Sequence, residues 1–276
     1  MNTTLVLGGT GTTGRRIARR LRDAGHPVRT ASRTGGDVRC DLGDPSTWTA
    51  ALDEVAGLYV LEPDLRAGID RNGRIPGLVK AAAAAGVRRV VMLSAHGVGE
   101  ADDGHPLKAA EQAVRASGVD WTILRPDWFA QNFSETFWRP AVLAGTLALP
   151  TGDGRTPFVD ADDIAEVAAA ALTDARHAGR TYQLTGPRSL DFAEAVEIIS
   201  QATGRTVRHV DVTAEAFVAQ QVAYGVAPDV AARLCGLLVA VREGRGPGVS
   251  DGVREALGRR ARGFEEFVAG AVGHWE

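Results

Sequence analysis

The sequence contains little of what would assign a protein to a metal-bound, disulfide-linked or membrane class. Only 2 of its 276 residues are cysteine, and Cys40 and Cys235 lie far apart and fit no metal-ligand spacing. We therefore expect two buried thiols in a reducing compartment and no bound metal. The first apolar run, residues 4–7, ends at Gly8 and is too short for a signal peptide or a membrane span. We expect a cytoplasmic protein without a membrane partner.

A large excess of charge of one sign is absent as well. The formal net charge is -3, and charged residues make up 24% of the chain. Because proteins that bind nucleic acid usually carry a strong basic excess, we expect no nucleic-acid partner. Hydrophobic residues make up 45%, as in ordinary globular proteins. We expect a monomer or a homodimer that acts on a small molecule, with one large α/β domain and a modest appendage.

The first half of the chain alternates between strand and helix patterns. Short apolar runs predict strands at residues 3–8, 28–31, 38–40, 57–61, 90–93 and 121–124. Amphipathic patterns and end signals predict helices at residues 12–24, at 44–53, in a segment ending at 85, and at 106–117. This alternation predicts a doubly wound parallel sheet with right-handed crossovers, which is a Rossmann fold.

The second half has a different pattern. Residues 128–143 are rich in aromatic side chains and are predicted to be helical, and 157–159 resemble a strand. A helix is predicted at 160–172, the last strand of the main sheet at 180–184, and beyond Gly186 helices at 191–203, 213–224, 228–243 and 263–272 with a strand at 207–212. We predict a dinucleotide-binding domain of residues 1–150, to which 155–186 return. A mostly helical substrate-binding lobe then spans 187–276.

Glycines crowd the junction between the first strand and the first helix, in TTLVLGGTGTTGRRIARRL. A tight turn needs one residue without a side chain, and the close approach of a diphosphate to the backbone needs another. A third glycine lets the helix pack on the strand, and the helix N-terminus presents free N–H groups to the phosphates. The pattern predicts a dinucleotide site formed by Gly8, Gly9, Thr10, Gly11, Thr12, Thr13 and Gly14.

The end of the second strand favours NADP(H) over NAD(H). Proteins that bind NAD usually place an acidic residue about 20 positions after the glycines. This chain has Ser32 and Arg33 there, and a guanidinium group can bind a 2′-phosphate through two hydrogen bonds. The alternative is that Arg33 is an ordinary solvated loop arginine. Asp41 and Leu42, after the third strand, complete the predicted cofactor site; for Asp41 the alternative is the aspartate of a turn.

Several motifs together resemble the NmrA-like group of atypical short-chain dehydrogenases. Besides the glycine turn and Ser32-Arg33, they are RVVMLS at 89–94, KAAE at 108–111, TILRP at 122–126, NF at 132–133, FVDADDIA at 158–165 and YQLTGP at 182–187. The resemblance covers essentially the whole chain and implies an NAD(P)-binding fold with a small C-terminal substrate lobe. The group includes quinone and azo reductases, isoflavone-reductase-like enzymes and ergot-alkaloid dehydrogenases, but also redox sensors without catalytic activity, so it indicates the cofactor better than the reaction.

The proton donor of typical short-chain dehydrogenases, a tyrosine four residues before a lysine, is missing. The residue four before Lys108 is Gly104, and none of the three tyrosines precedes a lysine at this spacing. Lys108 is the best remaining candidate, since the resemblance implies a lysine here that contacts the nicotinamide ribose or acts as an acid. It is also one of only two lysines in the chain. The alternative is a surface lysine paired with Glu111 or Glu100.

Three other polar residues flank the same expected cleft. Ser94 ends the fifth strand, where a hydroxyl group often bonds a substrate carbonyl; the alternative is that it caps the following turn. His96 and His105 titrate near neutral pH, and His105 is a second candidate acid while His96 is expected beside the substrate. Each histidine is more often a plain loop residue than a catalyst.

Aromatic residues after the sixth strand predict a pocket for a flat apolar substrate. Phe129, Phe133 and Phe137 are spaced by four and would share one helix face. We expect the substrate pocket to include Trp128, Phe129 and Phe133, with Asn132 orienting a polar group. The alternative for these aromatic residues is core packing.

The sequence therefore predicts an NADPH-dependent reductase that transfers hydride to a quinone, an enone, a carbonyl or an imine. Two alternatives stay open. One is a redox sensor that binds the dinucleotide and reports to a protein partner. The other is a lyase, cyclase or isomerase that retains a bound cofactor without net redox chemistry.

Overall fold

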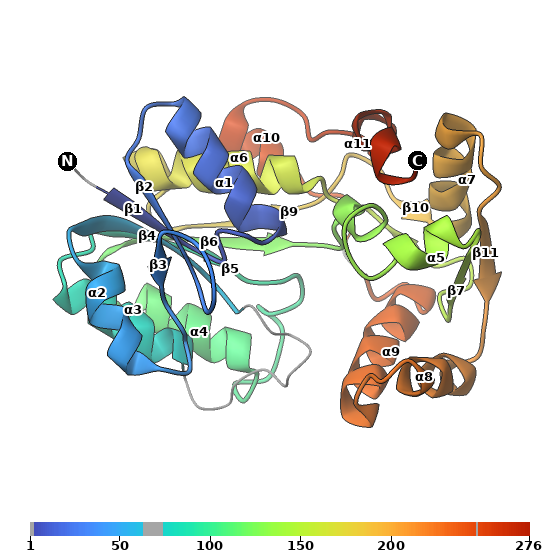
Figure 1. The fold of residues 1–276 in the computed structure, drawn as a ribbon, viewed down its shortest axis with the longest axis horizontal. Helices are drawn as coiled ribbons and strands as arrows, with labels where there is room; N and C mark the ends of the chain where they lie inside the picture. The colour runs from blue at the N-terminus through green and yellow to red at the C-terminus, as the bar shows by residue number, and fades with distance from the viewer. Residues whose placement is uncertain (1–2, 63–73, 247) are drawn as a thin grey trace. The chain divides into compact units, whose positions relative to one another are not determined.

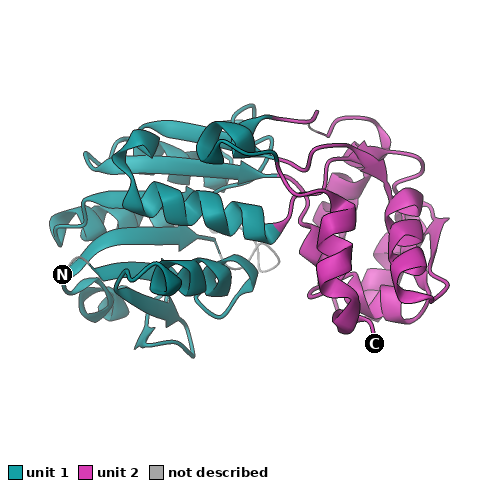
Figure 2. Ribbon diagram, turned by 90° about the horizontal axis from the view of Figure 1, so that it is seen from above, with its two compact units in different colours: residues 1–126, 161–184, 251–260 teal, residues 127–160, 185–250, 261–276 magenta. Residues whose placement is uncertain are grey.

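The computed structural model describes residues 3–62, 74–246 and 248–276. The chain forms two compact units (Figure 2). Unit 1 contains the residues up to Pro126 together with 161–184 and 251–260, and unit 2 contains 127–160, 185–250 and 261–276. This division differs from the predicted domains, because 127–150 belong to unit 2 and 251–260 return to unit 1. Which unit a segment joins depends on tertiary packing, which local sequence patterns do not reveal.

Unit 1 is built on a sheet of seven parallel strands (Figure 1). The strands are β1 (Thr3–Leu7), β2 (Val28–Ser32), β3 (Val38–Arg39), β4 (Val55–Leu61), β5 (Arg89–Leu93), β6 (Asp120–Pro126) and β9 (Arg180–Leu184). Their order is β3-β2-β1-β4-β5-β6-β9, so the chain turns back between β1 and β4. This confirms the doubly wound Rossmann sheet, whose ligands bind outside the carboxyl ends of the strands at such a reversal.

Helices cover both faces of this sheet, as Figure 1 shows. One face carries α1 (Thr12–Asp23), α6 (Ala161–Thr173) and α10 (Gly252–Leu257). The other carries α2 (Trp48–Leu52), α3 (Arg74–Ala84) and α4 (Pro106–Arg115), and short 3-10 turns lie at Pro45–Thr47 and Ala175–His177. The central strands are buried from both sides, which explains why β4 and β5 have continuous apolar sequences rather than alternating ones.

Local signals account for most of these helices. In α1 the side chains of Ile17, Ala18 and Leu21 are buried, as the amphipathic pattern predicts. Asp44 accepts a hydrogen bond from the Ser46 N–H at 3.3 Å and so caps the turn before α2, at the predicted start of this helical segment. The helix α10 was not predicted, because six residues carry too short a periodic pattern.

Unit 2 combines helices with two small two-stranded sheets. The strand β7 (Thr146–Leu149) pairs in parallel with β11 (Arg208–Asp211), and β8 (Arg155–Thr156) pairs antiparallel with β10 (Leu190–Asp191). The helices are α5 (Arg139–Leu143), α7 (Phe192–Thr203), α8 (Ala214–Ala223), α9 (Pro228–Arg242) and α11 (Phe264–Ala271), with 3-10 turns at Ala130–Asn132 and Val272–His274. The four helices predicted beyond Gly186 are therefore confirmed. Among the residues that the structure describes, no helix has both the length and the apolar character needed to cross a membrane.

The predicted helix over 128–143 is wrong for most of its length. Only a 3-10 turn and the five residues of α5 are helical there. Phe133 is fully buried whereas Phe137 is 38% exposed, so they do not share a face. The Phe133 ring lies in the core of unit 2, with its centroid 4.8 Å from that of Trp138 and 5.2 Å from that of Phe158. Phe133 therefore has the core-packing role that was the alternative for these side chains, whereas Phe137 does not.

Candidate active site

The predicted phosphate-binding turn connects β1 to α1. Gly8 has a φ of 65°, in the left-handed region that favours glycine. The turn closes where the Gly11 N–H donates to the Gly8 carbonyl oxygen at 2.8 Å. Gly11 then begins α1 with extended backbone and no side-chain cap. The strand, turn and helix that a dinucleotide-binding glycine motif requires are therefore all present.

The remaining glycines differ in why they are needed. A Cβ atom on Gly9 would lie 2.5 Å from the Cβ of Thr30 on β2, and one on Gly14 would lie 2.2 Å from the Gly8 carbonyl oxygen. These two glycines are required by packing within the fold, and Gly14 packs on the turn rather than on the strand. Gly11 is exposed, and its Cβ would approach Gly8 only to 3.2 Å. The missing side chain of Gly11 therefore leaves the surface before the helix open.

The first turn of α1 offers backbone amides to that open surface. Helix geometry leaves the N–H groups of Thr12, Thr13 and Gly14 without an intrahelical acceptor. This first turn contains no acidic side chain that would offset the partial positive charge of the helix end. The Thr13 side chain is buried, where its hydroxyl accepts a hydrogen bond from the Tyr59 hydroxyl at 2.9 Å, so this turn offers its amides rather than that side chain. Together with exposed Thr10, these amides fit a bound diphosphate.

The end of β2 leaves one cation exposed. The Ser32 hydroxyl donates to the Gly35 carbonyl at 2.5 Å and accepts from the Gly35 N–H at 2.7 Å, so it closes the loop. The carboxylate of Asp37 accepts from the Thr30 N–H at 2.8 Å, and this bond lowers its pKa. Arg33 is exposed and forms no ion pair with any residue in the described ranges. Its guanidinium group is therefore available to an anionic ligand.

Asp41 and Leu42 follow β3. The Asp41 carboxylate accepts from the Gly43 N–H at 2.9 Å, and its carbonyl oxygen accepts from the Trp48 indole N–H at 2.8 Å. This is the turn role that was the alternative to a place in the cofactor site. Leu42 is buried in the core of unit 1, so its side chain belongs to the packing.

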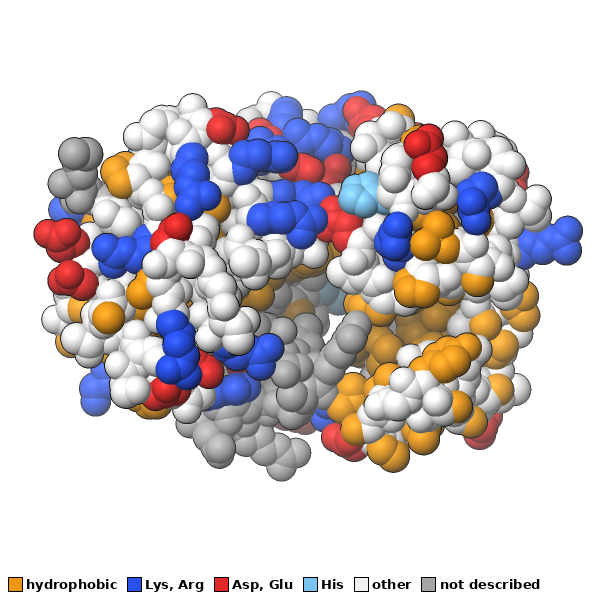
Figure 3. All heavy atoms as spheres, in the orientation of Figure 1, with side chains coloured by type: hydrophobic (Ala, Val, Ile, Leu, Met, Phe, Trp, Pro, Cys, Tyr) orange, Lys and Arg blue, Asp and Glu red, His pale blue; other side chains and the backbone are white. Residues whose placement is uncertain are grey.

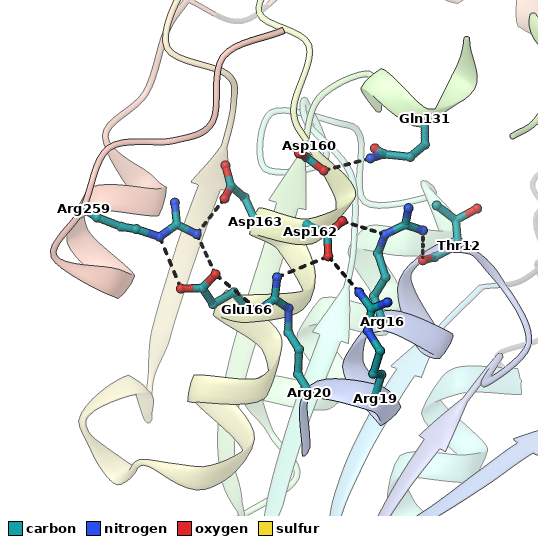
Figure 4. Close-up of polar contacts among 10 residues, drawn as sticks. All are labelled: Thr12, Arg16, Arg19, Arg20, Gln131, Asp160, Asp162, Asp163, Glu166 and Arg259. Atoms are coloured by element: carbon teal, nitrogen blue, oxygen red, sulfur yellow. Dashed lines mark hydrogen bonds and ion pairs between the residues drawn. The ribbon is translucent and has the colours of Figure 1, made fainter. Parts of the chain in front are cut away.

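Three arginines of α1 converge on Asp162 at the start of α6 (Figure 4). The shortest distances from the Asp162 carboxylate are 3.1 Å to Arg16, 3.2 Å to Arg20 and 3.6 Å to Arg19. Burial opposes ionisation of Asp162, but Arg16 and Arg20 outweigh it and lower its pKa. Arg16 also donates to the Thr12 carbonyl at 2.9 Å. Asp162 therefore holds α1, the helix that follows the predicted phosphate-binding turn, against α6.

A buried network lies where β5 ends. The Ser94 hydroxyl donates to Glu111 Oε1 on α4 at 2.6 Å. Arg125 on β6 donates to the same carboxylate through Nε at 2.9 Å and through Nη2 at 2.6 Å. Glu111 is only 2% exposed and Ser94 7%. This network joins one helix to the ends of two strands, and it uses the only hydrogen that the Ser94 hydroxyl has.

Both histidines at this edge are less basic than usual. Burial lowers the pKa of His96, although Glu100 opposes the shift. Burial also lowers the pKa of His105, which precedes α4, with Glu111 opposing. Within the part of the chain that the structure describes, the buried His105 Nδ1 atom has no hydrogen-bond partner. Both imidazoles are therefore neutral near pH 7.

Lys108 lies in the first turn of α4 and faces the loop that precedes the helix. Its Nζ atom donates to the Ala101 carbonyl oxygen at 2.5 Å and lies 3.2 Å from Asp103 Oδ1. The pairing differs from the predicted alternative, because the anion is Asp103 and not Glu111 or Glu100. An ammonium group has three donors, so Lys108 keeps one for a further acceptor.

Comparison with known proteins agrees with this fold and turn. The profile of the NmrA-like family matches residues 1–236. The oxidoreductase YesF of Bacillus subtilis is 37% identical over 99% of this chain and 96% of its own. The NAD(P)H azoreductase of Xenophilus azovorans is 34% identical over 96% of each chain. The triphenylmethane reductase of Citrobacter sp., solved with NADP(H), covers 98% of this chain and 100% of its own at 23% identity, with a TM-score of 0.81.

The chain belongs to the NmrA-like family. It is an oxidoreductase with the NAD(P)-binding type of Rossmann fold. The resemblance stated from the sequence motifs is therefore confirmed.

In this NmrA-like oxidoreductase, unit 2 exposes some of the predicted pocket residues and buries others. Trp128 is half-buried, and its ring stacks on Trp138 with centroids 5.3 Å apart. Phe129 is also half-buried and pairs with Val159. Asn132 accepts from the Thr136 hydroxyl at 3.0 Å, so its side chain already has a partner. Phe133, in contrast, is fully buried and does not line a pocket, which corrects its predicted role.

Sequence reasoning also missed a buried acid in unit 2. Asp127 follows β6 and is 8% exposed. Burial raises its pKa to about 6, although the Thr156 hydroxyl donates to its carboxylate and lowers it. Glu111, Arg125, Asp37 and Asp162 were likewise missed as members of networks, because each partner comes from a distant part of the chain. The available signal was the motifs themselves, since KAAE contains Glu111, TILRP contains Arg125 and FVDADDIA contains Asp162.

Proposed function

We propose that this NmrA-like oxidoreductase is an NADPH-dependent reductase that delivers hydride to a small apolar or aromatic acceptor, such as a quinone, an enone, a carbonyl or an imine. The observation that carries the proposal is the open end of α1. There Gly11 is exposed and Thr12 partly exposed, helix geometry leaves the amides of Thr12 and Thr13 without an intrahelical acceptor, and no acidic residue lies in the first turn. That donor set fits a diphosphate bridge. The oxidoreductase class of the relatives supports the reaction type.

The preference for NADPH over NADH rests on Arg33. An exposed arginine at the end of β2, without an ion pair to any described residue, suits a 2′-phosphate, which is a dianion near neutral pH. The carboxylate that an NAD-binding protein would place here is missing. Asp37, the nearest acid after β2, already accepts from both the N–H and the hydroxyl of Thr30.

When bound, the reduced nicotinamide supplies the hydride. The residues of unit 1 then hold it in place. We propose that Lys108 binds a ribose hydroxyl of the cofactor through the ammonium donor that Ala101 and Asp103 leave free. Such positioning fixes the distance between the hydride and the acceptor, which affects turnover more than binding.

An apolar surface of unit 2 supports the acceptor class. Trp128 and Phe137 lie edge to face, with ring centroids 6.4 Å apart, and both are partly exposed. In Figure 3, apolar side chains gather in the region of α8 and α9. The exposed ones there are Val222, Tyr224 and Leu237. Flat, hydrophobic molecules gain most from such a surface, because burial of apolar area drives their binding.

The test is the oxidation of NADPH in the presence of a panel of acceptors. We expect loss of the nicotinamide absorbance band with at least one quinone, enone or imine, together with formation of the reduced product. Tight binding of NADPH without turnover of any acceptor would favour a sensor. Conversion of a substrate without net loss of NADPH would favour a lyase or isomerase.

A further inference from the structure

The network of Ser94, Glu111 and Arg125 fixes where one hydrogen atom lies. Burial alone would raise the pKa of Glu111, but the hydrogen bonds from Arg125 and Ser94 outweigh it and lower the pKa. Glu111 is therefore a carboxylate near neutral pH and has no hydrogen to give. At an Oγ to Oε1 distance of 2.6 Å, the shared hydrogen is that of Ser94.

This assignment reverses the role that a serine at this position was expected to play. A serine hydroxyl has one hydrogen and two lone pairs. Because the hydrogen points to Glu111, Ser94 can offer only lone pairs to a bound molecule. It cannot donate to a ketone or quinone oxygen without breaking a bond to a buried carboxylate, and charge-assisted bonds of this kind are the strong ones.

Among the residues that the structure describes at the edge formed by β5 and α4, the other candidate proton donors are neutral or already engaged. None of the three tyrosines precedes a lysine by four residues. Burial holds the pKa of both His96 and His105 below the ordinary value near 6.5, so neither is an imidazolium at neutral pH. Lys108 directs two of its ammonium donors toward Ala101 and Asp103, and in the proposed function the third binds the ribose. An acceptor that brings its own proton would fit such an edge.

We propose that this site selects acceptors whose reacting group carries an N–H, namely protonated imines, and that Glu111 is the positioning residue that imposes the choice by holding Ser94 as a hydrogen-bond acceptor. The inference rests on the proposed function. The hydride adds to the imine carbon, and the C=N π electron pair moves to the nitrogen. That nitrogen already holds its proton, so the product is a neutral amine and no residue has to supply a proton. Ser94 accepts the N–H hydrogen bond throughout.

The test compares a cyclic imine with the cyclic ketone of the same ring size. For the native enzyme we expect a higher kcat/KM for the imine. Ser94→Ala should lower the imine kcat/KM about 10-fold or more, since bonds to charged groups are the stronger kind, and should leave the ketone value and NADPH affinity nearly unchanged. Glu111→Gln allows an amide N–H to point at Ser94 and so frees the serine hydrogen. Like Ser94→Ala, Glu111→Gln should therefore lower the ratio of the imine kcat/KM to the ketone kcat/KM.

The outcomes separate this inference from the proposed function. Equal losses for imine and ketone in Ser94→Ala, or a loss confined to NADPH affinity, would overturn the inference while leaving the reductase activity standing. If the native enzyme fails to oxidise NADPH with every acceptor tested, the proposed function itself is wrong. If Glu111→Gln does not fold, because Arg125 loses its partner, the result with Ser94→Ala decides alone.

Discussion

At the scale of single residues, the choice between the two nicotinamide dinucleotides depends on Arg33. We expect Arg33→Glu to weaken NADPH binding about 10- to 100-fold, because a charge-assisted hydrogen bond is worth about 1.5–3 kcal/mol. NADH, which lacks the 2′-phosphate, should lose little. Isothermal titration calorimetry with both nucleotides measures the two affinities.

A matched control for this variant is Arg208→Glu, since Arg208 is also exposed but lies on β11 in unit 2. It makes the same change in net charge and should leave both affinities unchanged. Equal losses for NADPH and NADH in Arg33→Glu would show that Arg33 does not bind the 2′-phosphate.

Lys108 is the residue whose substitution should separate turnover from binding. We expect Lys108→Ala to lower kcat about 10- to 100-fold through misplacement of the nicotinamide, with a much smaller change in NADPH affinity. Steady-state kinetics and calorimetry provide the two numbers. The only other lysine, Lys80, is exposed on α3, so Lys80→Ala is the natural control. An unchanged kcat in Lys108→Ala would remove Lys108 from the catalytic machinery.

The residue scale also shows where sequence patterns stop being informative. Arg33 and the glycines are found by their distance along the chain from a strand end, which the sequence displays. Glu111 has an ordinary helical position, and nothing local shows that Ser94 and Arg125 lie around it. Its importance comes from its position beside two strand ends, where it is only 2% exposed, and burial of a charged group depends on the whole fold.

At the scale of elements, substitutions at different positions of the glycine turn should affect different properties: stability at Gly14 and dinucleotide binding at Gly11. Gly14→Ala forces a Cβ atom to within 2.2 Å of the Gly8 carbonyl oxygen, so we expect a loss of about 1–3 kcal/mol in the free energy of unfolding. Gly11→Ala meets the same oxygen at 3.2 Å and should cost less stability. It should nevertheless weaken dinucleotide binding, because its methyl group covers the surface that the diphosphate approaches.

Urea denaturation and calorimetry on the same two variants provide the comparison. A Gly11→Ala protein that binds NADPH as tightly as the native one would show that the diphosphate does not approach this turn.

The junction of β6 with unit 2 should make stability depend on pH. Burial raises the pKa of Asp127 from 3.8 to about 6, so between these values the folded protein holds a proton that the unfolded chain has lost. This contribution to stability is complete below pH 3.8 and disappears as pH rises through about 6. Asp127→Asn keeps an acceptor for Thr156 but does not titrate. It should therefore gain stability relative to the native protein as pH rises from about 4 to about 7.

Urea denaturation of both proteins across this pH range measures the difference in free energy of unfolding. A difference that stays constant with pH would mean that the pKa of Asp127 is not raised in the folded state.

The predicted helices and strands are confirmed where hydrophobic periodicity and end signals coincide in the sequence. The strands of the main sheet and helices such as α1, α6 and α9 have both. The region after Pro126 misled the prediction, because aromatic residues at a spacing of four also occur when a turn packs its rings into a core. The short strands β7, β8 and β10 carry too few residues to show a period of two.

At the scale of the whole molecule, the chain crosses repeatedly between two units, each with its own core. The glycine turn, Arg33 and Lys108 belong to unit 1, and Trp128 and Phe137 belong to unit 2. Sequence periodicity identified the Rossmann part because every strand–helix repeat is local. It did not reveal that 251–260 return to unit 1, since that return depends on contacts between distant segments such as Gly252 and Gln183.

The central claim is that this oxidoreductase moves a hydride from NADPH to an organic acceptor, and isotope transfer tests it most directly. The enzyme is supplied with an enone, carbonyl or imine acceptor, whose reduced carbon keeps the transferred hydrogen, and with NADPH that carries deuterium at one face of nicotinamide C4 and, in a second reaction, at the other face. Mass spectrometry of the reduced acceptor is the measurement. The account predicts that deuterium from one face, and not from the other, appears on carbon in the product. Reduced product without deuterium from either face would contradict it.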